Sequence, residues 1–288
     1  MEKLNGTGVA LITPFTEKGA IDYDALKRVL DFTGEGVDYY VVLGTTGEVA
    51  TMTKDEKRAV LSFVKENNNK GLPIVYGIGG NNTAAVLEEI QLTDFEGVDA
   101  ILSVSPYYNK PSQAGIIAHF SAIASACPVP VIVYNVPGRT MSNMLATTTL
   151  TLSKHPNIIG IKEASGNLDQ CQEIANNKAE DFLLLSGDDL ITKEIIEMGG
   201  KGVISVLANG FPVEFSKIAR LALAEKFEES KAISDSFEDI NPLMYIESNP
   251  VGIKEVLRQK GICGNHVRLP LLPASKELER KISGLLRA

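Results

Sequence analysis

The chain contains few of the residues that mark a secreted or a membrane protein. Only three cysteines occur in 288 residues, and they are odd in number and far apart, at positions 127, 171 and 263. We therefore expect no disulfide framework and a reducing, cytoplasmic compartment. No apolar run reaches the roughly 18 residues of a membrane-spanning helix, and the segment Met1-Glu2-Lys3-Leu4-Asn5-Gly6 lacks the apolar stretch of a secretory signal. The sequence predicts no membrane partner.

Basic residues are also scarce. Lysine and arginine number 28 against 36 acidic residues, which gives a net charge of −8. This balance argues against nucleic acid or an anionic membrane surface as a partner. It does not exclude a small anionic substrate, because a pocket has its own local field. The histidines, His119, His155 and His266, lack the spacing of metal ligands, and we expect no metal and no other cofactor.

The sequence does contain a regular alternation of patterns. Short apolar runs recur along the chain, separated by helical patterns of about ten to fifteen residues. Most of these runs are apolar throughout, which is typical of strands in a parallel sheet that is covered by helices on both faces. We count eight such runs, at residues 8–13, 39–43, 74–78, 100–104, 131–135, 158–162, 182–185 and 202–207.

Eight strand–helix units within residues 1–224 predict a (β/α)8 barrel of the TIM type. A doubly wound sheet is the alternative, but it usually has fewer strands and a glycine fingerprint after the first one, which is absent here. Residues 225–288 contain no further strand pattern and predict a C-terminal helical appendage packed on the barrel. Within it, Asn249 and Pro250 predict a helix start, with the asparagine as N-cap and the proline at the first helical position.

In a barrel of this type the active site forms at the C-terminal ends of the strands. Lys162 ends the sixth apolar run, where desolvation would lower its pKa and leave a free amine that can attack a ketone. The alternative is a lysine at a strand exit with its ammonium in solvent. Tyr134 lies near the end of the fifth run, one strand away, and its phenol could move protons there. Otherwise it is a tyrosine of the core.

Other strand ends carry groups suited to a carboxylate. Arg139, in the loop after the fifth run, has a guanidinium that fits a carboxylate bidentately, although a solvated loop arginine is the default. Thr45 and Thr46 follow the second run between glycines, and such a turn can bind a carboxylate through hydroxyls and backbone N–H groups. Tyr107 and Tyr108, after the fourth run, suggest an interface or a cover over the barrel mouth.

Two adjacent acids, Asp188 and Asp189, follow the seventh apolar run. Many TIM barrels bind phosphate at this place. Two carboxylates would repel a phosphate, so the sequence argues against a phosphorylated sugar as the substrate.

Taken together, five segments at the strand ends resemble the dihydrodipicolinate synthase family. The resemblance covers essentially the whole chain, in order, and the segments are specific in combination although each is weak alone. They are Gly44-Thr45-Thr46-Gly47-Glu48, Ser105-Pro106-Tyr107-Tyr108-Asn109-Lys110-Pro111, Tyr134-Asn135-Val136-Pro137-Gly138-Arg139-Thr140, Gly160-Ile161-Lys162-Glu163-Ala164-Ser165-Gly166 and Ser186-Gly187-Asp188-Asp189.

The resemblance implies a lysine-based aldol condensation in diaminopimelate and lysine biosynthesis. Lys162 would form an imine with pyruvate, and the derived enamine would attack the aldehyde of L-aspartate 4-semialdehyde. The amine of the semialdehyde would then close the ring to 4-hydroxy-tetrahydrodipicolinate and displace the lysine. Tyr134 would be the proton donor and acceptor, with Thr45 and a neighbouring subunit's tyrosine at the position of Tyr108 completing the relay.

The resemblance also implies substrate contacts and an assembly. Thr46 would hold the pyruvate carboxylate, the backbone of Ile204 would contact pyruvate, and Arg139 would bind the carboxylate of the semialdehyde. The family usually assembles as a homotetramer of two tight dimers, which fits an interface at the two adjacent tyrosines.

One departure from the family concerns feedback inhibition by lysine. Inhibited relatives bind lysine at a cleft whose positions correspond here to Lys54, Lys57 and Ala85. Two fixed cations repel a cationic ligand, and the alanine removes a carboxylate partner. We therefore expect weak or absent inhibition by L-lysine.

Two rival functions remain open at this point. N-acetylneuraminate lyase and 2-keto-3-deoxy sugar acid aldolases share the lysine, the tyrosine and the glycine-rich turn, but Arg139 suits a small carboxylated aldehyde better than a polyol. A catalytically inactive barrel used for binding is also compatible with the fold. The intact set of polar residues argues against it.

Overall fold

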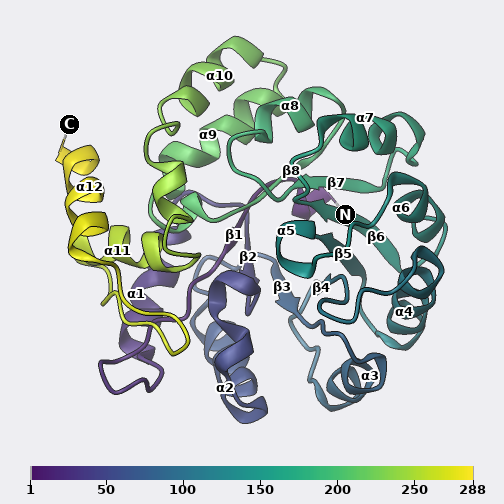
Figure 1. The fold of residues 1–288 in the computed structure, drawn as a ribbon, viewed down its shortest axis with the longest axis horizontal. Helices are drawn as coiled ribbons and strands as arrows, with labels where there is room; N and C mark the ends of the chain where they lie inside the picture. Colours follow the sequence, from purple (N-terminus) through teal and green to yellow (C-terminus); the bar gives the residue numbers. More distant parts are fainter. Residues whose placement is uncertain (1, 288) are drawn as a thin grey trace.

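The computed structural model describes residues 2–287, and its centre is a closed barrel of eight parallel strands (Figure 1). Each strand pairs with the next, and β8 pairs with β1 to close the ring. The predicted (β/α)8 TIM barrel is therefore confirmed. The strands are β1 Gly6–Ala10, β2 Tyr39–Val42, β3 Ile74–Gly77, β4 Ala100–Val104, β5 Val131–Asn135, β6 Ile158–Glu163, β7 Leu183–Ser186 and β8 Gly202–Ser205.

Helices surround the barrel and connect its strands (Figure 1). Helices α1 to α4 and α6 to α9 belong to this ring, the short α5 directly follows β5, and α10 to α12 follow the ring in the chain. The α-helices are α1 Tyr23–Thr33, α2 Lys54–Asn67, α3 Thr83–Leu92, α4 Gln113–Ala126, α5 Pro137–Thr140, α6 Ala146–Leu152, α7 Leu168–Asn177, α8 Thr192–Glu197, α9 Pro212–Leu223, α10 Phe227–Asp235, α11 Val251–Gln259 and α12 Lys276–Arg287.

The first strand differs most from its predicted position. It was predicted at 8–13, but β1 spans Gly6–Ala10 because Gly6 pairs with Gly202 of β8. The N–H of Leu11 still donates to Val41 of β2, but the N–H of Ile12 donates to the side chain of Asn209, so the chain leaves the sheet there. The other seven apolar runs overlap the observed strands and differ from them by at most two residues at either end, with β6 and β7 each extending one residue past the predicted end.

Side chains alternate between the two sides of the barrel wall and so build two cores. Ile132 and Tyr134 of β5 belong to an inner cluster that fills the barrel, whereas Val131 and Val133 pack outward against the helices. On β6, Ile161 packs outward, so the neighbouring Lys162 faces inward. Strand periodicity thus places the lysine and the tyrosine inside the barrel.

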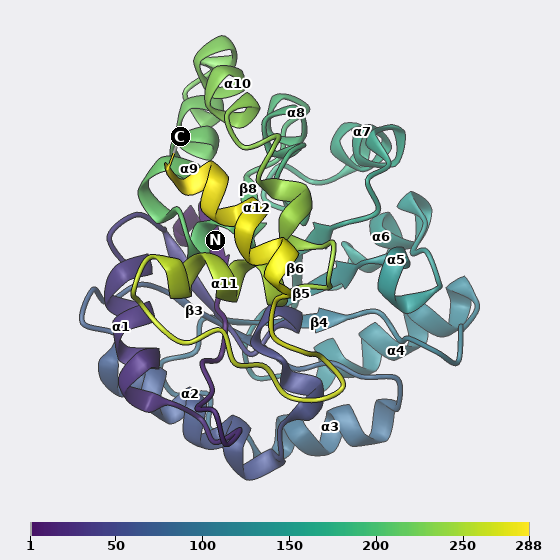
Figure 2. The same ribbon diagram turned by 60° about the vertical axis from the view of Figure 1, so that its left-hand side comes forward.

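The C-terminal region packs on the barrel as a group of helices. Helix α10 packs on α9, and α11 packs against α12 (Figures 1 and 2). The predicted cap at Asn249 is wrong: α11 begins at Val251 with Pro250 in the N-cap position. The side chain of Asn249 instead donates a 2.9 Å hydrogen bond to the hydroxyl of Thr46, in the turn after β2. A tertiary contact has replaced the local one.

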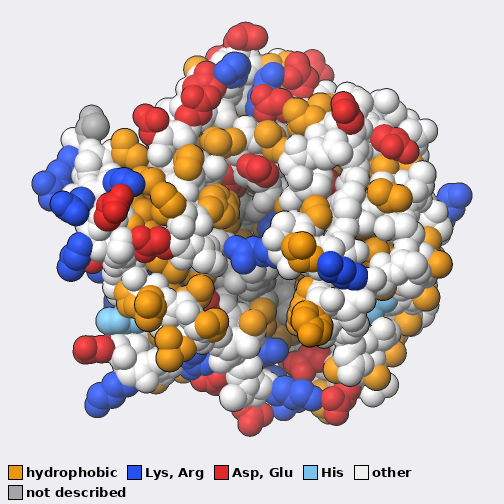
Figure 3. Space-filling view, in the orientation of Figure 1, with side chains coloured by type: hydrophobic (Ala, Val, Ile, Leu, Met, Phe, Trp, Pro, Cys, Tyr) orange, Lys and Arg blue, Asp and Glu red, His pale blue; other side chains and the backbone are white. Residues whose placement is uncertain are grey.

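The C-terminal ends of the strands face the viewer in Figure 1, where the short helix α5 after β5 lies in front of the barrel. The space-filling view in the same orientation shows a hollow near the middle of this face (Figure 3). Within residues 2–287, no helix has the length and apolar character needed to cross a membrane.

Candidate active site

A pocket of about 270 Å³ opens at the C-terminal ends of the barrel strands. It brings together side chains that are far apart in the chain, because β2, β5, β6 and β7 all end at this rim. Five of the seven predicted site residues line it, namely Thr45, Thr46, Tyr134, Arg139 and Lys162. The other two, Tyr108 and Ile204, do not.

Lys162 is buried, with 6% of its surface exposed, at the inner end of β6. It lies in register with Tyr134 of β5, and its Nζ is 4.5 Å from the centre of the tyrosine ring. No carboxylate within residues 2–287 lies at salt-bridge distance from this ammonium. Burial lowers the pKa of Lys162 to about 8, with Asp189 raising it and Arg139 lowering it further. About a tenth of the amine is therefore unprotonated at pH 7, far more than for a lysine with the ordinary pKa of 10.5.

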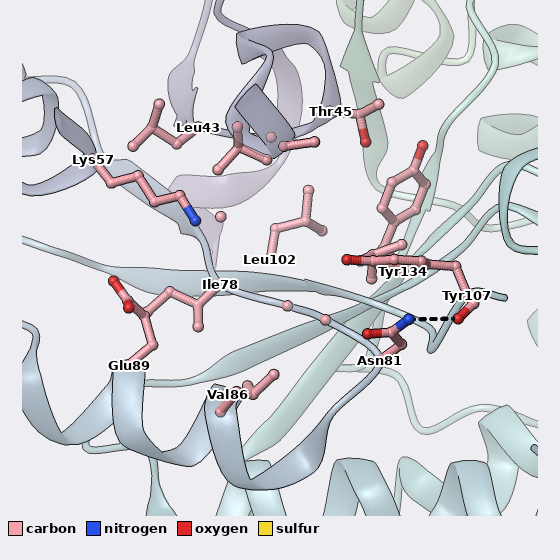
Figure 4. A pocket seen from close by; sticks show the side chains of 18 of the residues that line it. Leu43, Thr45, Lys57, Ile78, Asn81, Val86, Glu89, Leu102, Tyr107 and Tyr134 are labelled. Atoms are coloured by element: carbon pink, nitrogen blue, oxygen red, sulfur yellow. Dashed lines mark hydrogen bonds between the residues drawn. The ribbon is translucent and has the colours of Figure 1, made fainter. Parts of the chain in front are cut away.

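Tyr134 is buried, and its phenol lies at the same end of the pocket as the hydroxyl of Thr45 (Figure 4). Burial raises the pKa of Tyr134 to about 12, and the charge of Arg139 and the hydroxyl of Thr45 partly offset this rise. A phenol with this pKa keeps its proton at neutral pH. It can donate that proton to a developing alkoxide or amine and recover it in a later step.

The turn that carries Thr45 and Thr46 approaches the barrel closely. A side chain at position 77 would collide with the carbonyl oxygen of Leu43, only 2.1 Å from where its Cβ would lie, so Gly77 lets the turn sit against β3. The hydroxyl of Thr46 is buried and accepts the hydrogen bond from Asn249. No sequence pattern indicated this partner, because it lies 203 residues away in the chain.

Arg139 lies exposed on α5, and the two ends of its loop are fixed by a buried amide network. At one end, Nδ2 of Asn135 donates to both carboxylate oxygens of Glu163, at 3.1 Å each. At the other end, the N–H of Met144 donates to Asn135 and the amide of Gln170 donates to Glu163. The loop is held at its base while the guanidinium remains free to meet a ligand.

Gly187 lines the pocket and Asp189 lies behind it, close enough to raise the pKa of Lys162, and neither was singled out as a site residue. Asp189 is buried, and its Oδ2 accepts hydrogen bonds from the N–H groups of Val206 and Leu207, at 3.2 and 2.8 Å, beyond the end of β8. Burial raises the pKa of Asp189 to about 6. Gly187 leaves room for the lysine, since a Cβ there would lie 3.0 Å from Cε of Lys162. The segment Ser186-Gly187-Asp188-Asp189 was the only sequence signal for either.

The remaining predicted residues lie outside the pocket. Tyr108 is 88% exposed on the loop after β4 and adopts a left-handed backbone with φ of 74°. Ile204 is buried in the inner cluster of the barrel, paired with Gly8 of β1. Among the described residues, no three His, Cys, Asp or Glu side chains lie together in the manner of a metal site.

A second cavity, of about 430 Å³, adjoins the pocket and shares Thr45, Tyr134 and Arg139 with it. Lys54, Lys57 and Ala85 line its outer part. Figure 4 shows Lys57 reaching over this cavity from one side and Glu89 from the other. Lys54 forms an exposed salt bridge of 2.7 Å with Glu88, which offsets its charge. Lys57, the second lysine at the cavity, forms no salt bridge within residues 2–287.

The chain is similar over its whole length to proteins of one family. The model of the dihydrodipicolinate synthetase family matches residues 3–288. The 4-hydroxy-tetrahydrodipicolinate synthase of Cytophaga hutchinsonii is 52% identical over 98% of this chain and 95% of the relative, and that of Flavobacterium psychrophilum is 48% identical over 98% and 97%.

Solved structures show the same likeness. The dihydrodipicolinate synthase from Aquifex aeolicus matches with a TM-score of 0.94 at 37% identity, covering 99% of this chain and 97% of that one. The protein from Cyanidioschyzon merolae, solved with lysine bound, matches with a TM-score of 0.94 at 36% identity over 99% and 98%.

Proposed function

The chain belongs to the dihydrodipicolinate synthetase family, and on that basis we propose that it condenses pyruvate with L-aspartate 4-semialdehyde to 4-hydroxy-tetrahydrodipicolinate. This reaction serves diaminopimelate and lysine biosynthesis. The observation that carries the proposal is Lys162, a buried lysine with a lowered pKa and no salt bridge, placed beside a buried tyrosine. Arg139 at the rim of the same pocket supports a second substrate with a carboxylate.

The chemistry starts at the free amine of Lys162. It attacks the ketone carbon of pyruvate, and the carbinolamine loses one water to give an imine. Loss of a methyl proton converts the imine to an enamine, whose carbon forms a bond to the aldehyde carbon of the semialdehyde. The substrate amine then adds to the imine carbon, closes the ring and releases Lys162. One water is lost overall, and the aldehyde oxygen remains as the 4-hydroxyl.

Tyr134 moves the protons that these steps require. Its phenol lies over the ammonium of Lys162 and next to Thr45. We assign it the protonation of the carbinolamine hydroxyl and of the aldehyde oxygen, with Thr45 passing the proton on. The partner subunit's Tyr108 completes the relay in this proposal. Its exposure on the isolated chain supports a role across an interface and not in its own pocket.

The substrate contacts follow from the position of each polar group. Thr46 binds the pyruvate carboxylate through its hydroxyl and backbone N–H, at a turn that lines the pocket with Gly44 and Thr45. The backbone of Ile204 contacts pyruvate from β8. Arg139 binds the carboxylate of the semialdehyde, because its guanidinium is free at the rim and its loop is anchored.

We further propose that the protein is a cytoplasmic homotetramer built from two tight dimers. Tyr107 and Tyr108, 42% and 88% exposed, support a dimer contact beside the pocket. The cysteines at 127, 171 and 263 are all free and buried, which supports a reducing compartment.

Borohydride trapping tests the proposed reaction. The protein is incubated with pyruvate, reduced, digested and examined by mass spectrometry, with and without L-aspartate 4-semialdehyde. We expect a pyruvate-derived adduct on Lys162 that the semialdehyde depletes. An adduct that the semialdehyde leaves unchanged would favour a sugar-acid lyase, and no adduct would refute the imine chemistry. Lys162→Met serves as the negative control.

A further inference from the structure

The C-terminal region reaches the active-site turn through a buried ion pair that the proposed mechanism does not use. Nζ of Lys254, on α11, lies 2.5 Å from Oε1 of Glu48, which ends the turn carrying Thr45 and Thr46. The side chains are 0% and 2% exposed. The two residues are 206 positions apart in the chain.

Each charged group of the pair makes further contacts. The Lys254 ammonium donates a second hydrogen bond of 2.8 Å to the carbonyl of His266 and lies 4.4 Å from the centre of the Phe15 ring. The other carboxylate oxygen of Glu48 accepts from the N–H of Arg268 at 3.0 Å. Each charge is thus held from several directions, which fixes the position of Glu48 relative to the C-terminal region.

An ion pair of this kind is poor evidence for stability. Removing two charges from water is costly, and a buried pair often stabilises a fold no better than apolar residues of the same volume. What such a pair does provide is geometry, because only one arrangement satisfies both charges. The pair is therefore better explained by a role in positioning the turn than by a role in stabilising the fold.

The turn itself requires such a restraint. Leu43 and Glu48, at its two ends, adopt left-handed backbones with φ of 58° and 55°. Residues with a Cβ are strained in this conformation and keep it only where surrounding contacts hold the backbone in place. Next to α11, Asn249 makes a second contact by donating to the hydroxyl of Thr46. The C-terminal region therefore contacts the turn at its middle and at its end.

We propose that Lys254 and Glu48 are positioning residues, whose ion pair holds Thr45 and Thr46 in the orientation that binds the carboxylate of the ketone substrate. This inference rests on the proposed function for the identity of that substrate. It adds that the C-terminal region takes part in recognising the carboxylate, although none of its charged side chains lines the pocket.

The test separates carboxylate recognition from general damage to the site. Reductive trapping on Lys162 is measured with pyruvate and with acetone, a ketone without a carboxylate. For Glu48→Gln and Lys254→Met, we expect the half-saturating pyruvate concentration to rise at least tenfold, while the trapping rate with acetone stays within twofold of wild type. Equal losses with both ketones would overturn the proposal, and so would no loss with either.

A matched control comes from the same helix. Glu255 is the next residue, equally buried, but it pairs with Arg258 and accepts from Asn265 and makes no contact with Glu48. Glu255→Gln should leave the preference for pyruvate over acetone within twofold of wild type. A tenfold change there would show that any buried charge lost from α11 has this effect, and would refute a specific role.

The double variant Glu48→Gln/Lys254→Met distinguishes positioning from stability. It leaves no unpaired buried charge, so its unfolding midpoint should recover relative to Lys254→Met alone. The half-saturating pyruvate concentration should stay at least tenfold above wild type. Recovery of pyruvate binding together with stability would refute the proposal. If wild type itself forms no adduct on Lys162, the proposed function fails, which is distinct from failure of the positioning role.

Discussion

Replacing Lys162 with methionine should make the protein more stable while abolishing its activity. Burial lowers the pKa of Lys162 in the folded protein to about 8, well below the ordinary value of 10.5 for this side chain. Each unit corresponds to about 1.4 kcal/mol between the two protonation states. At pH 7, burying the charged form therefore costs about 3 kcal/mol, and an apolar side chain of similar length removes that cost.

Because burial lowers the pKa of Lys162, the cost of burying its charge depends on pH in one direction. Between pH 8 and 10.5 the unfolded chain binds a proton that folded Lys162 releases, so wild-type stability rises with pH across this window. Below pH 8 both states hold the proton and the full cost remains. The stabilisation from Lys162→Met should accordingly be complete at pH 7 and fall below about 1 kcal/mol at pH 10.

Thermal unfolding at a fixed protein concentration measures this difference. For a chain of this size, about 3 kcal/mol corresponds to a rise in midpoint of roughly 6 °C at pH 7. Lys217→Met, at an exposed position on α9, is the control and should change stability by less than about 0.5 kcal/mol. Two results would refute the conclusion that Lys162 buries an unpaired charge. One is a Lys162→Met variant less stable than wild type, and the other is an equal gain in stability at pH 7 and pH 10.

Three further predictions concern the proposed roles. Tyr134→Phe should lower kcat by about 100-fold or more, because the phenolic proton donor is lost, with the KM for pyruvate changed less than fivefold in steady-state assays; an unchanged kcat would refute the relay. Arg139→Leu should raise the KM for the semialdehyde about 100-fold, as expected when a charged hydrogen bond is lost, and an effect on pyruvate instead would reassign the guanidinium. L-Lysine at 1 mM should leave more than half of the activity, because Lys57, which forms no salt bridge within residues 2–287, repels the ammonium groups of L-lysine at the adjoining cavity. Inhibition by half at sub-millimolar L-lysine would contradict this.

The fold and most of the pocket could be predicted from the sequence because both depend on local patterns. The apolar runs along the chain indicated strands that are buried on both faces. A closed parallel barrel brings the C-terminal ends of all these strands to one rim. Polar residues that follow the runs, such as Thr45 and Lys162, then had to meet. The register of the sheet, which pairs Tyr134 with Lys162, completed the arrangement.

The contacts that the sequence did not reveal are tertiary and polar. Lys254 and Glu255 are adjacent charged residues in a short helix, a pattern that normally indicates a solvated face. Both are fully buried, because each finds a partner that no local pattern identifies. Asn249 was assigned to a local cap for the same reason, and its true partner, Thr46, lies in the turn after β2. Pattern reasoning has no means of matching such distant partners.

The two buried lysines show how one fold makes a reactive amine and an inert one from the same side chain. Burial lowers the pKa of both Lys162 and Lys254. Lys254 nevertheless donates to Glu48 and to a backbone carbonyl and lies against Phe15, so its proton is held and no ketone can reach it. Lys162 has an aromatic face beside it and an open pocket above it. Pairing, and not burial, therefore decides which lysine is the nucleophile, and a ketone adduct should form on Lys162 alone.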